Sequence, residues 1–98
     1  MKVRNMTSSK GNKVANQFII SRYTDEHELG EETFQSYNAT IATKVYDLDD
    51  TVSQIYLDKV YWNYSVTTGK YRNIFLGETK KETEAKIKSG EYILTDLN

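Results

Sequence analysis

The chain has 98 residues, no cysteine, no proline and a formal net charge of −1. A chain of this length makes one domain, and without cysteine it forms neither disulfides nor thiolate metal sites. It has no run of eighteen apolar residues, which argues against a membrane-spanning helix. We therefore expect a single cytoplasmic domain over residues 1–98 with no membrane partner. Because so small a domain buries a modest core, a homodimer would be a simple way to bury more surface.

The charged residues are unevenly distributed along the chain. Residues 1–22 carry five cations and no anion, whereas residues 23–58 carry nine anions and a single cation, Lys44. Residues 59–98 carry a small excess of cations. Two interpretations stay open. Acidic loops can simply keep a small protein soluble, or they can form a surface of one sign that faces a basic partner.

The N-terminal third of the chain predicts an arm, a strand and a turn. Residues 1–12 are polar and predict a flexible N-terminal arm. Residues 13–20 end in three apolar residues, a pattern typical of a strand. Residues 23–32 are rich in carboxylates and contain Gly30, so they predict an acidic turn region.

Three short strands are predicted next, and their spacing favours an antiparallel meander. Alternating or β-branched residues mark strands at 33–37, 40–46 and 52–57. A break at 38–39 separates the first two, and an acidic turn at 47–50 separates the last two.

The segment 60–76 is ambiguous between a helix and a hairpin. Val60, Trp62, Tyr64 and Val66 alternate as in a strand, and a turn at 67–70 would then lead into another strand. Against the hairpin, Ser65 and Thr67 are good N-cap residues. Thr67, Tyr71 and Phe75 also recur at helical spacing, with Ile74 beside them. We favour a short helix over residues 66–76.

A second helix is clearer. Thr79-Lys80-Lys81-Glu82 fits the capping-box pattern, and Gly90 is a natural residue to follow the last turn. The helix has few apolar groups and is expected at the surface. Residues 91–97 predict a final strand. The fold class is therefore α+β, with an antiparallel sheet of about four to five strands and one or two short C-terminal helices.

The sequence offers no catalytic constellation, and we expect neither enzymatic activity nor a cofactor. His27 is the only histidine, and it lies among carboxylates that could in principle bind a divalent metal. A run of acids in a loop is far more often solvated surface, so no metal site is expected. Ser36, Ser53 and Ser65 lack the surroundings of an activated nucleophile.

Two sets of residues are candidates for binding a partner. The first is the acidic patch, expected to lie in turns: Asp25, Glu26, Glu28, Glu31, Glu32, Asp47, Asp49 and Asp50. The second is an aromatic and basic patch within residues 59–72: Lys59, Tyr61, Trp62, Tyr64, Lys70, Tyr71 and Arg72. Such residues can stack on single-stranded nucleic acid or lie at a protein interface, but the favoured interpretation is that these rings form the core of an aromatic-rich domain. A local excess of two positive charges is weak for nucleic-acid affinity.

Two segments carry a resemblance to a known group of proteins. They are Phe-Gln-Ser-Tyr-Asn-Ala-Thr-Ile-Ala at 34–42 and Trp-Asn-Tyr-Ser-Val-Thr-Thr-Gly-Lys-Tyr-Arg-Asn-Ile-Phe-Leu-Gly at 62–77. From residue 12 onward the chain resembles small uncharacterised accessory proteins of phages, prophages and plasmids of Gram-positive bacteria. The resemblance transfers no active-site residue. It implies a bacterial host and a setting that includes anti-CRISPR proteins, several of which inhibit Cas9.

The resulting hypothesis is a non-enzymatic accessory protein of a mobile element. Its expected partner is a host defence protein, a nuclease of the Cas9 type, met by the acidic patch. The alternative is a nucleic-acid-binding accessory protein that uses the aromatic and basic patch. Nucleic acid is the less expected partner because the acidic segment should repel phosphate.

Overall fold

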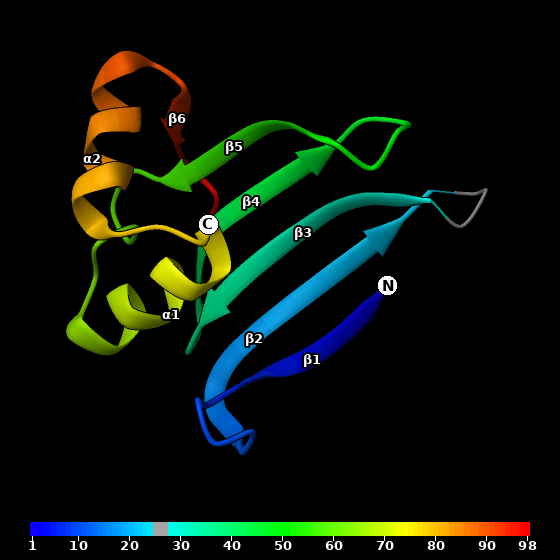
Figure 1. The fold of residues 1–98 in the computed structure, drawn as a ribbon, viewed down its shortest axis with the longest axis vertical. Helices are drawn as coiled ribbons and strands as arrows, with labels where there is room; N and C mark the ends of the chain where they lie inside the picture. The colour runs from blue at the N-terminus through cyan, green and yellow to red at the C-terminus, as the bar shows by residue number, and fades with distance from the viewer. Residues whose placement is uncertain (25–27) are drawn as a thin grey trace.

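The computed structural model describes residues 1–24 and 28–98 of the chain. Five antiparallel strands come first, then two helices, then a short last strand (Figure 1). The elements are β1 (Lys2–Thr7), β2 (Lys13–Tyr23), β3 (Leu29–Ser36), β4 (Ala39–Tyr46), β5 (Val52–Asp58), α1 (Val66–Leu76), α2 (Lys80–Ser89) and β6 (Tyr92–Thr95). The α+β class and the C-terminal helices are confirmed, but the sheet has six strands rather than four or five.

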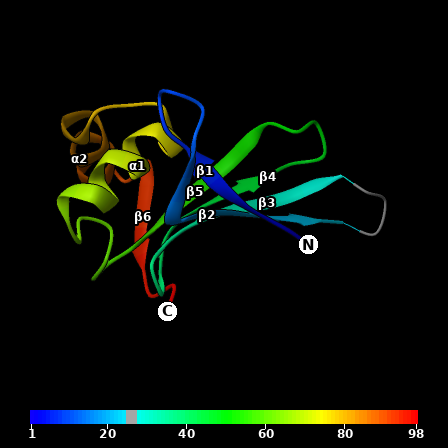
Figure 2. The same cartoon turned by 90° about the horizontal axis from the view of Figure 1, so that it is seen from below.

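The strands form one sheet in the order β1-β2-β3-β4-β5-β6. The first five pair antiparallel as a meander, whereas β6 pairs parallel to β5. A parallel neighbour needs a crossover connection, and α1 and α2 supply it. Both helices lie on one face of the sheet, toward the end opposite the β4–β5 connection (Figures 1 and 2).

The expectation of a flexible arm over residues 1–12 is wrong for most of that segment. Lys2–Thr7 is an edge strand that pairs with β2, where Val3 lies opposite Ile20. Its Met6 side chain is buried in the core. The strand is polar and short, so its own pattern is weak, and pairing with the long β2 is what orders it. Residues 8–12 form the connection, in which Gly11 N–H donates to Ser8 O at 2.9 Å.

The core lies between the sheet and α1. Phe34, Ile41 and Leu57 of the sheet are fully buried. The Phe34 and Phe75 rings meet with centroids 5.8 Å apart. Beside them the hydroxyls of Ser36 and Thr68 lie 2.8 Å apart, so even the polar contacts here join β3 to the helix.

The helix expected at 66–76 is confirmed, but its buried face differs by one residue from the expected face. Ser65 is the N-cap and accepts from Thr68 N–H, and Gly77 ends the helix in the left-handed conformation at φ 70°. The buried positions are Thr68, Tyr71, Arg72 and Phe75, whereas Thr67 and Ile74 are exposed. Tyr71 and Phe75 are buried as expected, and Thr68, which contacts the Ser36 hydroxyl, takes the place expected for Thr67.

The second helix and the final strand also match expectation. Thr79 and Glu82 form the full capping box, and Gly90 follows the last turn at φ 83°. Only Thr83 of this helix is buried, so α2 is a surface helix as expected. It is fastened to β6 by Glu78, which accepts from Lys86 Nζ at 2.8 Å and from the Tyr92 hydroxyl at 2.6 Å.

A buried aspartate fixes the C-terminal tail. Asp58, at the end of β5, is 1% exposed. Its carboxylate accepts from the N–H groups of Val60, Tyr61 and Leu97 at 2.8–3.0 Å. Burial alone would raise the pKa of Asp58, but these hydrogen bonds outweigh it and hold the pKa below its usual range. The tail then reaches β4, where Thr40 O accepts from the Asn98 amide at 3.0 Å.

Candidate binding surfaces

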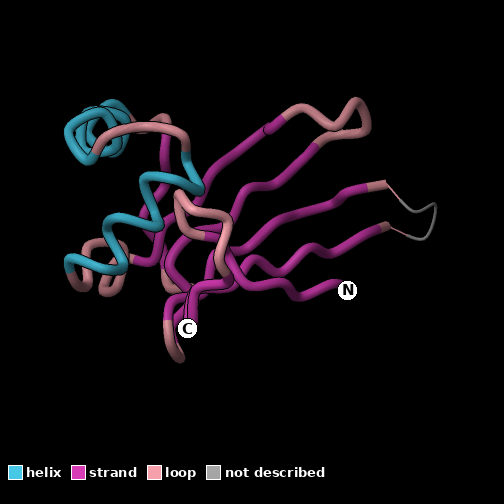
Figure 3. Tube along the Cα trace, turned by 60° about the horizontal axis from the view of Figure 1, so that its bottom comes forward, coloured by secondary structure: helices cyan, strands magenta, loops and turns pink. Residues whose placement is uncertain are grey.

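The C-terminal end of β2 and the N-terminal end of β3 lie at the same end of the molecule as the β4–β5 connection, and this end is here called the hairpin end (Figures 1 and 3). The strand register is consistent with this arrangement, because Glu31 near the start of β3 lies opposite Val45 near the end of β4. The helices cover the other half of the sheet. The hairpin end therefore extends beyond the core.

The β4–β5 turn holds two exposed carboxylates in a fixed position. Asp47 Oδ1 accepts from Asp49 N–H at 3.0 Å and from Thr51 N–H at 3.1 Å, so the Asp47 side chain builds the turn. Asp49 and Asp50 are exposed, and Asp50 has φ 58°. Aspartate and asparagine tolerate this left-handed conformation better than most residues. The turn thus presents Asp49 and Asp50 to solvent, as the sequence predicts for these two residues.

Glu31 and Glu32 were expected in a turn, and this is wrong because both lie in β3. Glu31 Oε1 is 3.3 Å from Arg22 Nη1, and Glu32 Oε2 is 3.7 Å from Arg4 Nη2. The Tyr46 hydroxyl also donates to Glu32 Oε1 at 2.7 Å. Burial, together with this bond to Glu32, raises the pKa of Tyr46. Arginines of the basic N-terminal segment therefore offset part of the acidic segment's charge.

Of the remaining members of the acidic patch, the structure describes Glu28 but not Asp25 and Glu26. Glu28 is half-buried, and its N–H donates to Thr24 Oγ1 at 3.2 Å where the β2–β3 connection closes. Asp25, Glu26 and His27 lie outside the residues that the structure describes. The exposed acids shown at the hairpin end are therefore Asp47, Asp49 and Asp50, of which Asp47 has its carboxylate engaged in the turn.

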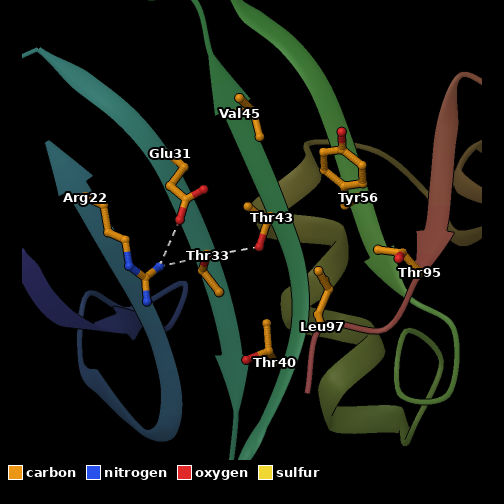
Figure 4. A pocket seen from close by; sticks show the side chains of 9 residues that line it. All are labelled: Arg22, Glu31, Thr33, Thr40, Thr43, Val45, Tyr56, Thr95 and Leu97. Atoms are coloured by element: carbon orange, nitrogen blue, oxygen red, sulfur yellow. Dashed lines mark hydrogen bonds and ion pairs between the residues drawn. The ribbon is translucent and has the colours of Figure 1, made fainter. Parts of the chain in front are cut away.

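The face of the sheet away from the helices is hollowed. A cavity of about 560 Å³ lies over β3 and β4 (Figure 4). Its floor is Thr33 and Thr43, whose hydroxyls are 3.1 Å apart, and Arg22 Nη1 donates to Thr33 Oγ1 at 3.3 Å from the rim. Tyr56 and Leu97 line the opposite side. The sequence analysis missed this hollow, although the alternation of residues along 40–46 was a signal that Thr43 would face away from Ala42.

The aromatic and basic patch does not form one surface. Tyr71 and Arg72 are buried in the core side of α1, and Trp62 is half-buried with the Arg72 guanidinium 5.2 Å from its ring centroid. Tyr64 is exposed and meets Tyr61 edge-on at 5.5 Å. The two lysines of the patch, Lys59 and Lys70, are exposed. Burial of two of the seven residues removes them from any stacking platform.

A strained turn lies near this patch and was missed by the sequence analysis. Tyr37 connects β3 to β4 with φ 55°, and its N–H donates at 2.7 Å to the carbonyl of Asn16, which itself has φ 63°. A bulky residue in the left-handed region is a rare and costly conformation. Tyr37 and Tyr64 are both exposed and line a hollow of about 480 Å³ with Ser65 and Thr67.

The described residues show neither a metal-ligand cluster nor a membrane-spanning helix. Within residues 1–24 and 28–98, histidine, cysteine and carboxylate side chains form no group of three or more that could hold a metal ion. In the same part of the chain, no helix is both long enough and apolar enough to cross a membrane.

Comparison with known proteins places the chain in a family without assigning an activity. Residues 1–91 match the family described as "Family of unknown function (DUF8033)". The match covers nearly the whole chain, and the protein belongs to this family. Neither the curated proteins nor the solved structures contain a significant match.

Proposed function

We propose that the protein is a non-enzymatic accessory protein of a mobile element that acts by binding a host defence nuclease of the Cas9 type. The contact surface in this proposal is the hairpin end. The observation that supports it most is the β4–β5 turn, where the Asp47 carboxylate accepts from Asp49 N–H and Thr51 N–H while Asp49 and Asp50 are exposed.

The negative charge of the hairpin end complements the positive charge of the proposed target. Cas9-type nucleases hold guide and target in a positively charged channel. Fixed carboxylates beyond the end of a sheet can approach such a channel without moving the core, and attraction between opposite charges speeds association. The class of target itself rests on the resemblance of residues 34–42 and 62–77 to proteins of mobile elements.

The competing proposal, a nucleic-acid-binding accessory protein, needs the aromatic and basic patch to face solvent together. Burial of Tyr71 and Arg72 argues against that arrangement. The other members that remain accessible are spread over the β5–α1 connection and α1. We therefore favour a protein target over nucleic acid.

A matched pair of variants tests the proposal. Asp49→Lys with Asp50→Asn changes the charge of the hairpin end, and asparagine suits the left-handed Asp50 position. Glu84→Lys with Glu91→Gln makes the same net change at exposed sites on α2 and before β6. Inhibition of DNA cleavage is measured against a panel of Cas9 enzymes from Gram-positive hosts. The hairpin variant should lose inhibition at least about tenfold, whereas the control should keep it.

Two outcomes would overturn the proposal. A parent protein that inhibits no Cas9 in the panel would remove the target. A folded hairpin variant that inhibits as well as the parent would remove the acidic contact surface, even with the target correct.

A further inference from the structure

A cavity of about 630 Å³ lies at the N-terminal end of α1, away from the hairpin end, and is here called the α1 cavity. Asn63 and Ser65 line it from the β5–α1 connection, Gly69 and Lys70 from the helix, and Lys80 from the first turn of α2. Arg72 also lines it, while no carboxylate of the described residues does. Three cationic residues therefore line one hollow.

Arg72 carries a buried charge without an acidic partner in the described part of the chain. The residue is 1% exposed, and its Nη1 and Nη2 donate to the neutral oxygens Trp62 O at 2.8 Å and Asn73 Oδ1 at 3.0 Å. Its Nε has no hydrogen-bond partner among the described residues. Glu78 and Glu84 act on Arg72 only at longer range. A buried cation with no counter-ion is costly, and an anion in the α1 cavity would supply one.

The helix terminus adds a donor to the same hollow. The first N–H groups of a helix have no partner within the helix and carry a partial positive charge. In α1, Ser65 occupies the Thr68 N–H, and the first turn contains no acidic residue. By contrast, α2 has Glu82 in its first turn. The amide of Val66, a residue that lines the α1 cavity, is therefore left to face a ligand or water.

Glycine at position 69 keeps the cavity open. Gly69 is inside α1 and does not have a left-handed φ. A Cβ built there would meet Arg72 Nη2 at 3.7 Å, which is ordinary contact. Packing therefore accepts alanine, which is also the better helix former. The missing side chain leaves the helix backbone at Gly69 open on the cavity side.

We propose that the α1 cavity binds a phosphate monoester. The Val66 amide, Lys70 and Lys80 contact its oxygens, and the charge of Arg72 lies behind them. Helix N-termini with converging cations are suited to phosphate, and the volume falls in the range of small-ligand sites. This site is independent of the hairpin end and of the identity of the protein target.

The test is an amide chemical-shift titration of the full chain with inorganic phosphate and with adenosine monophosphate. Shifts that saturate at millimolar or lower ligand and centre on Val66, Gly69 and Lys70 are expected. Gly69→Ala should remain folded and weaken binding by about tenfold or more. Lys70→Met with Lys80→Met should also weaken it, while Lys81→Met with Lys88→Met, which removes two lysines outside the cavity, should not.

Several results would overturn the proposal. These are no saturable shift with either ligand, equal binding by the Gly69→Ala variant, or sulfate binding as tightly as phosphate monoesters, which would mean an unselective anion site. Binding of a single-stranded oligonucleotide without terminal phosphates, with no response to the two monoesters, would reassign the cavity to the nucleic-acid backbone.

Discussion

The hairpin end and the helix end of the molecule use charged residues in opposite ways. At the hairpin end, charges lie on exposed turns or in exposed cross-strand pairs such as Arg22 with Glu31. At the helix end, Asp58, Arg72 and Glu78 are buried and hold the β5–α1 connection, the tail and α2 in place. Charge at the first end is therefore available for a partner, whereas charge at the second end mainly maintains the fold.

The largest loss of stability is expected from Asp58→Ala. The substitution removes the acceptor for three backbone N–H groups and frees the tail from β5. Leaving buried donors without a partner costs about 1–3 kcal/mol each when water cannot replace it, so we expect a total loss of about 3 kcal/mol or more in urea unfolding. Asp96→Ala is the control, because the exposed Asp96 bonds only Asn98 N–H at 3.0 Å. Equal losses in the two variants would contradict the structural role of Asp58.

Glu78→Gln should cost less, about 2 kcal/mol at neutral pH. The Glu78 side chain is 4% exposed. Burial alone would raise its pKa, but hydrogen bonds from Lys86, Thr83 and Tyr92 outweigh burial and hold the pKa below its usual range. Burial, together with the hydrogen bond that Tyr92 donates to Glu78, raises the pKa of Tyr92 to about 12.

The lowered pKa of Glu78 also fixes the sign of a pH dependence. Its stabilising contribution is complete above the ordinary carboxyl pKa and is lost as the pH falls through the lower folded-state pKa. Unfolding free energies measured from neutral to acid pH should therefore fall less steeply in the Glu78→Gln variant than in the parent. Asp58 keeps part of the slope in both, because its pKa is lowered as well. Parallel curves would show that Glu78 does not contribute.

A gain of about 0.5–1 kcal/mol is expected for Gly69→Ala, since alanine is the better residue inside a helix and meets only ordinary contacts here. Thermal unfolding checks it. Gly77→Ala is the contrasting change, because Gly77 has φ 70° and alanine there should destabilise. Loss of stability in the first variant would mean that Arg72 cannot tolerate the added methyl group.

The smallest effect belongs to the hairpin end. Asp49→Lys with Asp50→Asn should change the free energy of unfolding by less than about 0.5 kcal/mol, as is usual for exposed positions. Glu31→Lys with Glu32→Lys should cost more, because each glutamate faces an arginine across the sheet. If the variant with Asp49→Lys and Asp50→Asn were unfolded, charged residues at the hairpin end would also maintain the fold, which would contradict the difference between the two ends.

Local signals predicted the helices well. Ser65, Thr79 and Gly90 mark helix ends in the sequence, and each is used as a cap. The meander from β2 to β5 was also predictable from alternation and turn residues. Such features depend on residues close in sequence.

Features that depend on distant pairing were not predictable in the same way. The edge strand β1 is weakly patterned and is ordered by β2, and β6 takes a parallel position only because two helices carry the chain across. The pairs Arg22–Glu31 and Arg4–Glu32 require the register of three strands. Without that register, the acidic patch looks more uniform in the sequence than it is in the folded protein.

The central claim is that the hairpin end contacts a Cas9-type nuclease while the helix end maintains the fold. Hydrogen exchange of the protein, alone and mixed with each nuclease of the panel, tests it most directly. The account predicts new protection at residues 29–32 and 46–52 with at least one nuclease, and no change along α1 and α2. Protection confined to the helices, or no protection with any nuclease, would contradict it.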